Sequence, residues 1–187
     1  MVVLLAMALA FAQSALPNWN LHAALWTATP PALKTGLAVG GAIEAQFPLG
    51  DGPFFAAGRL ALGDATEAST QWLFDDYETQ ALVALGMATK IDLAQLWFSL
   101  GAGGLLIEES LHRQQYQRLQ ADGIAGTVQS AWTMGPVASA ELGVALNFAG
   151  AWSAVISGGP TVTRLNVSGA RVVRWGGTAQ LGVGYAF

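Results

Sequence analysis

The chain has 187 residues, of which 53% are hydrophobic and only 11% are charged, and it contains no cysteine. Soluble domains usually have about 25% charged residues, so this composition is unusually apolar. The lack of cysteine excludes disulfides and cysteine-based metal sites. The formal net charge of −4 provides no basic field and argues against a nucleic-acid partner.

The apolar composition does not come from membrane helices. After the N-terminus, no segment has the ~20 consecutive apolar residues that a transmembrane helix needs. The only other structure that satisfies its own backbone hydrogen bonds in hydrocarbon is a closed β-barrel. The length suits one such domain.

The N-terminus reads as a targeting segment. Residues 1–11 (MVVLLAMALAF) form an unbroken apolar run, and Ala10 and Ala12 supply the small residues that precede a cleavage site. We therefore predict a signal peptide over residues 1–12, cleaved after Ala12, and a barrel domain over residues 13–187.

Alternation with a period of two predicts strands in the remainder. It is clearest in Trp132–Phe148, where bulky residues such as Met134, Leu142 and Leu146 share one face. The other face carries small and polar residues. A soluble barrel such as a lipocalin places its bulky residues inside, so this inverted arrangement predicts a narrow lumen and a lipid-facing wall.

The same pattern predicts eight strands: Leu21–Ala28, Leu37–Pro48, Phe54–Asp64, Tyr77–Lys90, Leu93–Glu108, Trp132–Phe148, Trp152–Leu165 and Trp175–Phe187. Three short turns alternate with four longer connections, near residues 29–35, 65–71, 109–127 and 166–174. Outer-membrane barrels have short periplasmic turns and longer surface loops. The predicted fold is thus an all-β, eight-stranded antiparallel up-and-down transmembrane barrel.

The last strand ends in Phe187, with Tyr185 on the same face. On these residues and the pattern before them, the chain resembles the small eight-stranded outer-membrane barrels of the OmpA-transmembrane-domain and OmpX type. The resemblance implies that Tyr185 and Phe187 form the C-terminal signal read by the barrel-insertion machinery. It also implies export to the outer membrane and contact with its lipid and lipopolysaccharide.

Three charged residues are predicted to face the lumen: Glu44, Arg59 and Glu141. Glu44 and Arg59 lie on strands joined by one turn, close enough for a diagonal cross-strand pair. An unpaired charge in a narrow lumen is costly, so we interpret these residues as a structural polar plug. A small ion or proton path is the alternative.

The longest connection, residues 109–127, holds the candidate surface-contact residues His112, Arg113, Tyr116 and Arg118. Ser110 and nearby glutamates also suggest a hydrolase, but a serine nucleophile needs a rigidly oriented histidine and carboxylate. We predict no catalytic residue, no cofactor and, with two histidines and no cysteine, no metal site.

The predicted function is therefore that of a monomeric, non-enzymatic barrel of structural or surface-interaction type, with residues 109–127 as its chief contact site. Two alternatives stay open: a lipid- or peptide-modifying enzyme at the outer rim and, more weakly, a narrow pore, since so small a barrel is nearly filled by side chains. A soluble binding barrel is the alternative fold. The sequence identifies no ligand or biological process.

Overall fold

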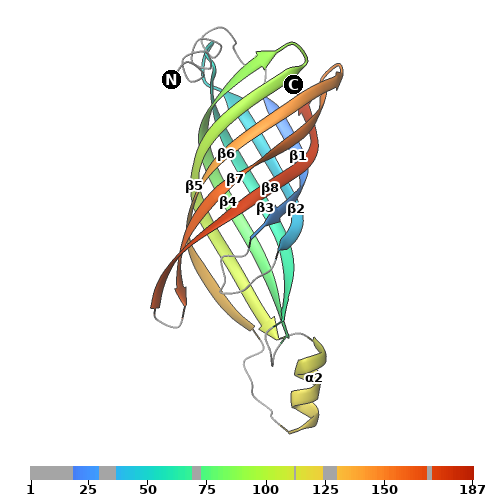
Figure 1. Cartoon of the computed structure of the whole chain (residues 1–187), viewed down its shortest axis with the longest axis vertical. Helices are drawn as coiled ribbons and strands as arrows, with labels where there is room; N and C mark the ends of the chain where they lie inside the picture. Colours follow the sequence, from blue (N-terminus) through green and yellow to red (C-terminus); the bar gives the residue numbers. More distant parts are fainter. Residues whose placement is uncertain (1–18, 30–36, 69–72, 112, 124–129, 168–169) are drawn as a thin grey trace.

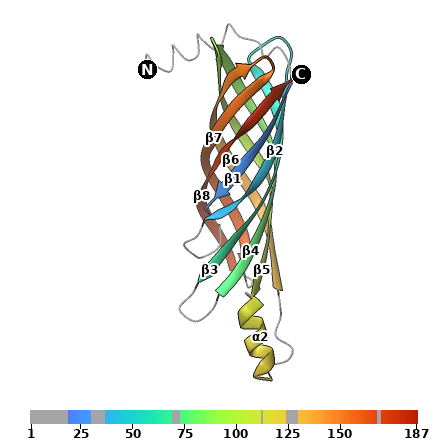
Figure 2. The same ribbon diagram turned by 90° about the vertical axis from the view of Figure 1, so that its right-hand side faces the viewer.

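The computed structural model describes residues 19–29, 37–68, 73–111, 113–123, 130–167 and 170–187. The strands form a closed antiparallel barrel in which neighbours in the sequence pair and the first strand pairs with the last. Figures 1 and 2 show a long barrel with steeply tilted strands and a short helix beyond one end. No helix within these ranges is long and apolar enough to cross a membrane. The predicted signal peptide, residues 1–12, lies outside the described residues.

The described elements are β1 (Asn20–Ala28), β2 (Ala38–Pro48), β3 (Phe54–Ala68), β4 (Leu73–Ile91), β5 (Ala94–Leu111), α2 (Arg113–Ala121), β6 (Ser130–Ala149), β7 (Trp152–Val167) and β8 (Ala170–Ala186). The predicted eight-stranded antiparallel barrel is confirmed.

The predicted boundaries of three long connections were wrong. Residues 65–68, 109–111, 166–167 and 170–174 belong to strands, and residues 113–121 of the longest connection form a helix. The strands continue because backbone pairing does not require apolar side chains. Asp75, for example, pairs with Thr66 on β3 and with Ser110 on β5. Alternation of apolar residues fades before the hydrogen-bonded ladder ends.

The short connections lie at the same end of the barrel as the C-terminus, and α2 lies at the opposite end (Figure 1). The turn after β2 is closed by Leu49, whose N–H donates to the Phe54 carbonyl at 2.9 Å. Gly50 and Gly150 have positive φ values of 72° and 57°, a conformation that glycine adopts without steric cost. We call the two ends the short-turn end and the loop end.

Side chains alternate between the outside and the inside of the barrel as predicted. On β6, Leu142 is 64% exposed, whereas its neighbour Glu141 is 4% exposed. Trp132, Trp152 and Trp175 are exposed, and Trp97 is buried inside. Large apolar residues therefore cover the outer wall and polar residues share the interior, the reverse of a soluble barrel.

The interior is narrow, and glycines make room for its aromatic side chains. A Cβ atom at Gly143 would lie 2.0 Å from the Trp97 ring, and one at Gly86 would lie 2.4 Å from the Phe55 ring. Both rings belong to one apolar cluster inside the barrel. Two further apolar clusters form around Trp26 and around Leu82 and Leu165. The lumen is therefore packed with side chains, as expected for eight strands.

Aromatic residues cover the seam where β8 meets β1 at the short-turn end. The Phe187 ring stacks on Trp19 with centroids 4.2 Å apart, and the Phe187 N–H donates to the Trp19 carbonyl at 3.0 Å. Tyr185 contacts both Phe187 and Trp152 edge to face, each at 4.9 Å. These contacts reinforce the pairing that closes the barrel.

Substitution of neighbouring residues on β6 tests the two faces. We expect Leu142→Arg to lower the free energy of unfolding in lipid vesicles by about 2–4 kcal/mol, because it places a charge on the lipid-facing wall. Gly143→Arg should prevent folding, since the Trp97 ring occupies the space that a Cβ would need. Heat-modifiable gel mobility and urea titration in vesicles measure both effects. A Leu142→Arg barrel as stable as the wild type would contradict the assignment of the outer face.

Candidate functional site

A network of charged side chains crosses the middle of the barrel interior. Glu44 on β2, Arg59 on β3 and Glu141 on β6 are 8%, 7% and 4% exposed. Arg59 Nη1 donates a hydrogen bond to Glu141 Oε2 and lies 3.9 Å from Glu44 Oε2. One guanidinium therefore stands between two carboxylates, and its main partner is on the opposite wall of the barrel.

The structure corrects the predicted geometry of this group. Glu44 and Arg59 are directly opposite each other in the β2–β3 register rather than diagonal. Pairing of Glu44 with Arg59 follows from the turn at residues 49–53, which sets every pair on these two strands. The contact between Arg59 and Glu141 spans 82 residues of sequence, and alternation alone gives no information about such a contact.

Amide and imidazole groups complete the network. Gln46 Nε2 donates to Glu44 Oε1 at 2.9 Å, and Gln180 Nε2 donates to Glu141 Oε2 at 3.1 Å. His22 Nδ1 lies 3.9 Å from Glu44 Oε1. The sequence pattern gave no connection between these two residues, His22 and Gln180, and the carboxylates. A usable signal for Gln46 was its position two residues after Glu44, on the same face of β2.

The network closes the lumen around it. The cavity bounded by Glu44, Arg59, Ser99 and Glu141 has a volume of about 10 Å³, which is at the lower limit for one water molecule. Buried charges require partners and hydrogen bonds to offset their loss of hydration, and both carboxylates have them. The arrangement suits a plug that holds the strands together.

A larger cavity opens at the short-turn end. Its volume is about 330 Å³, and the turn residues Gly150 and Ala151 contribute to its rim. His22 lines its inner part and packs against the Trp97 ring, with ring centroids 5.5 Å apart. The small cavity lined by Glu78, Gln80 and Thr161, on the other side of the network, measures only about 10 Å³. At the short-turn end, the interior thus begins as an open vestibule, which ends at the packed centre.

The second candidate region is the connection between β5 and β6. The backbone of Arg113 and Tyr116 lies in α2, but their side chains and all of His112 lie outside the described residues. Arg118 is exposed on the last turn of α2. Figure 2 shows that α2 lies beyond the loop end of the barrel, next to the end of β5.

Ser110, the serine of the hydrolase-like group near this connection, makes a structural contact. Ser110 Oγ donates to the Asp75 backbone carbonyl at 3.3 Å, which ties β5 to β4. Across the residues that the structure describes, no group of three histidine or acidic side chains is arranged to hold a metal ion.

Comparison with known structures supports the fold. The sequence matches no protein-family model and no curated protein. Solved structures of three small outer-membrane proteins are similar. Ail, the attachment invasion locus protein of Yersinia pestis, has a TM-score of 0.53 at 17% identity, covering 91% of this chain and 97% of that one. Its complex with the heparin analogue sucrose octasulfate gives 0.52 at 16%, with the same coverage.

Neisserial surface protein A has a TM-score of 0.56 at 13% identity, covering 90% of this chain and 96% of that one. OprG of Pseudomonas aeruginosa has a TM-score of 0.53 at 10% identity, covering 91% and 95%. The predicted resemblance to small outer-membrane barrels is confirmed at the level of the fold. Identities this low carry no particular activity or partner to this chain.

Removal of the central cation tests the plug. We expect Arg59→Met to lower the free energy of unfolding by about 3–5 kcal/mol, because two buried carboxylates lose their cation. Adding Glu44→Gln and Glu141→Gln to Arg59→Met should restore most of this loss, since the remaining groups are neutral. Urea titration in lipid vesicles compares the three proteins. If Arg59→Met alone unfolded at the wild-type urea concentration, the network would have no structural role.

Proposed function

We propose that this protein is an outer-membrane β-barrel of structural or surface-interaction type that meets its partner through the loop at residues 109–127. Two observations together carry the proposal: the centre of the lumen is packed, and helix α2 lies beyond the loop end (Figure 1). A packed centre leaves the outer surfaces and the vestibule at the short-turn end as the places where binding can occur. An apolar outer wall matches residence in a lipid bilayer.

The helix within the loop favours an anionic partner, although Glu109 and Asp122 flank it. Residues 113–121 (RQQYQRLQA) contain two arginines, a tyrosine and no acidic residue. Arginine binds sulfate, phosphate and carboxylate groups through several N–H donors at once. The solved complex of Ail with a sulfated sugar makes a sulfated glycan a suitable probe. Contact with lipopolysaccharide at the outer surface is part of the same proposal.

The loop helix provides a direct test of this role. We expect Arg118→Gln to weaken binding to immobilised heparin by about tenfold, the effect of losing one charge-assisted hydrogen bond. Replacing residues 112–123 with a glycine–serine linker of equal length should abolish binding while the barrel still shifts its gel mobility on heating.

Lys90→Gln is the matched control, because it removes one exposed positive charge at the opposite end of the barrel. Equal loss of heparin binding in Lys90→Gln and Arg118→Gln would show that net charge, rather than the loop, governs binding. Binding retained by the linker variant would overturn the proposed contact site.

We also propose that Tyr185 and Phe187 on the last strand are read by the barrel-insertion machinery. Phe187→Ala should reduce the amount of assembled barrel in cells. It should cost only about 0.5–1.5 kcal/mol of stability after unaided refolding in detergent, the value of one aromatic pair. Trp19→Ala removes the other ring of the same stack and should cost at least as much stability.

The two variants separate recognition from stability. If the machinery reads Phe187, Trp19→Ala assembles in cells better than Phe187→Ala. If both variants assemble equally, the terminal rings serve only to close the seam.

A further inference from the structure

The outer wall of the barrel has a hollow of about 590 Å³ across β4, β5 and β6. Its outward-facing lining consists of Thr79, Ala81, Gly104, Leu106, Met134 and Pro136. These residues form two rows across the strands. Ala81, Gly104 and Pro136 are in register, and so are Thr79, Leu106 and Met134. Small residues at the centre of the first row make the hollow, and the larger side chains of the second row form its wall.

The hollow lies in the half of the barrel nearer the loop end. The next outward-facing row consists of Tyr77, Glu108 and Trp132. Tyr77 and Trp132 are 54% and 61% exposed, as expected for side chains at a membrane–water interface. The hollow therefore lies on the membrane-core side of the interface, at the depth of the first carbons of the lipid chains in the leaflet at the loop end.

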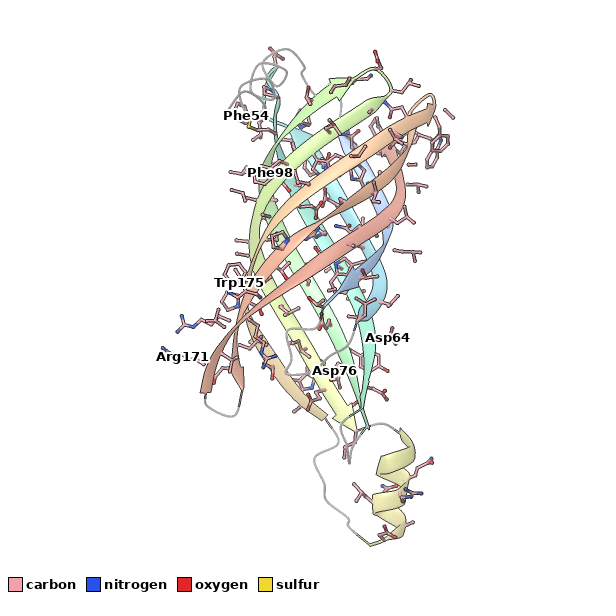
Figure 3. All side chains as sticks on the ribbon, in the orientation of Figure 1. Phe54, Asp64, Asp76, Phe98, Arg171 and Trp175 are labelled. Carbon is pink, nitrogen blue, oxygen red and sulfur yellow. The ribbon has the colours of Figure 1, made fainter. Side chains whose placement is uncertain are left out.

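A positive charge lies next to the hollow. A Cβ at Gly135, which lies between Met134 and Pro136, would be 2.0 Å from the Arg164 carbonyl oxygen, so β7 runs directly beside the hollow at Arg164. The Arg164 side chain is exposed on the outward face, opposite Val173 on β8. Val173 lies between Trp175 and Arg171, and Figure 3 shows these two residues at the loop end of β8, Arg171 nearer the tip.

Charges around the hollow orient an occupant. Glu108 lies on the central strand β5, one outward-facing row beyond Leu106 toward the loop end, and would repel an anion. Arg164 lies on the β7 side and would attract one. An amphiphile with a hydrocarbon chain and a phosphate matches this arrangement when its chain fills the hollow and its phosphate contacts Arg164.

We infer that this hollow binds one acyl chain of lipid A, the phosphorylated and multiply acylated glucosamine lipid of the outer leaflet, with a lipid A phosphate on Arg164. If the hollow stayed empty, the residues that line it would lack van der Waals contacts on that side. An ordered chain restores them. The headgroup phosphate then gives one lipid a fixed position on the wall.

This inference rests on the proposed membrane orientation but not on the proposed contact role of residues 109–127. Each of these two proposals can therefore be contradicted without the other. Loss of heparin binding reports on the loop, whereas retention of lipid A reports on the wall.

Gly104→Leu is the sharpest test, because a Cβ at this position meets nothing within 4 Å. The added side chain fills the hollow without disturbing the barrel. The barrel is refolded in detergent, titrated with lipid A and analysed by native mass spectrometry. We expect the wild type to retain one lipid A, and Gly104→Leu and Arg164→Gln each to bind it at least about tenfold more weakly.

Matched controls come from the same chain. Gly58→Leu adds the same side chain to another strand glycine with open space around its Cβ, at an outward-facing position on β3. Lys90→Gln removes an exposed positive charge from the short-turn end of the barrel. Both controls should retain lipid A at the wild-type level. If Gly104→Leu fails the heat-modifiability test for folding, Ala81→Leu fills the same hollow from β4.

Two results would overturn the inference. One is wild-type retention of lipid A by folded Gly104→Leu or Ala81→Leu. The other is equal retention of phosphatidylglycerol by the wild type, which would show a general affinity for anionic lipid instead of a lipid A site.

Discussion

The hydrogen bonds between β1 and β8 are the constraint on which the rest of the structure depends. All nine residues of β1 pair with β8 on one side and with β2 on the other. Closure leaves no open edge whose unpaired N–H and C=O groups would have to enter hydrocarbon. It also joins the first strand to the last, so each strand is held by neighbours on both sides. The aromatic stack of Trp19 and Phe187 covers this seam.

Closure with eight strands fixes a narrow lumen, and the narrow lumen determines which residues can occupy it. The Trp97 ring fits inside because Gly143 faces it. The charged side chains at its centre form a group, with Arg59 between Glu44 and Glu141 and with amide donors from Gln46 and Gln180. The same packing that stabilises the barrel leaves little space at its centre. The binding surfaces that we propose therefore lie outside the lumen.

Sequence reasoning predicted the strands, their faces and the closed eight-stranded barrel, but it missed where some strands end and which side chains meet across the lumen. Alternation located each strand and its lumen face, because side-chain direction follows directly from position along a strand. It ended β3 at Asp64 although pairing continues to Ala68, because backbone pairing is independent of side-chain polarity. It also missed the contact between Arg59 and Glu141. Which residues meet across a lumen depends on strand stagger around the whole ring.

Helix α2 escaped prediction for a related physical reason. Its nine residues are too few for an isolated helix to be stable in water, and its polar sequence lacks the apolar stripe by which sequence patterns reveal a helix. A surface loop on a rigid barrel is free to vary because its residues contribute little to the core. The barrel therefore places the residues needed for folding and the residues proposed for binding in different regions. Closure and packing restrict the strands, while the loop-end residues and the outer wall can change to suit a partner.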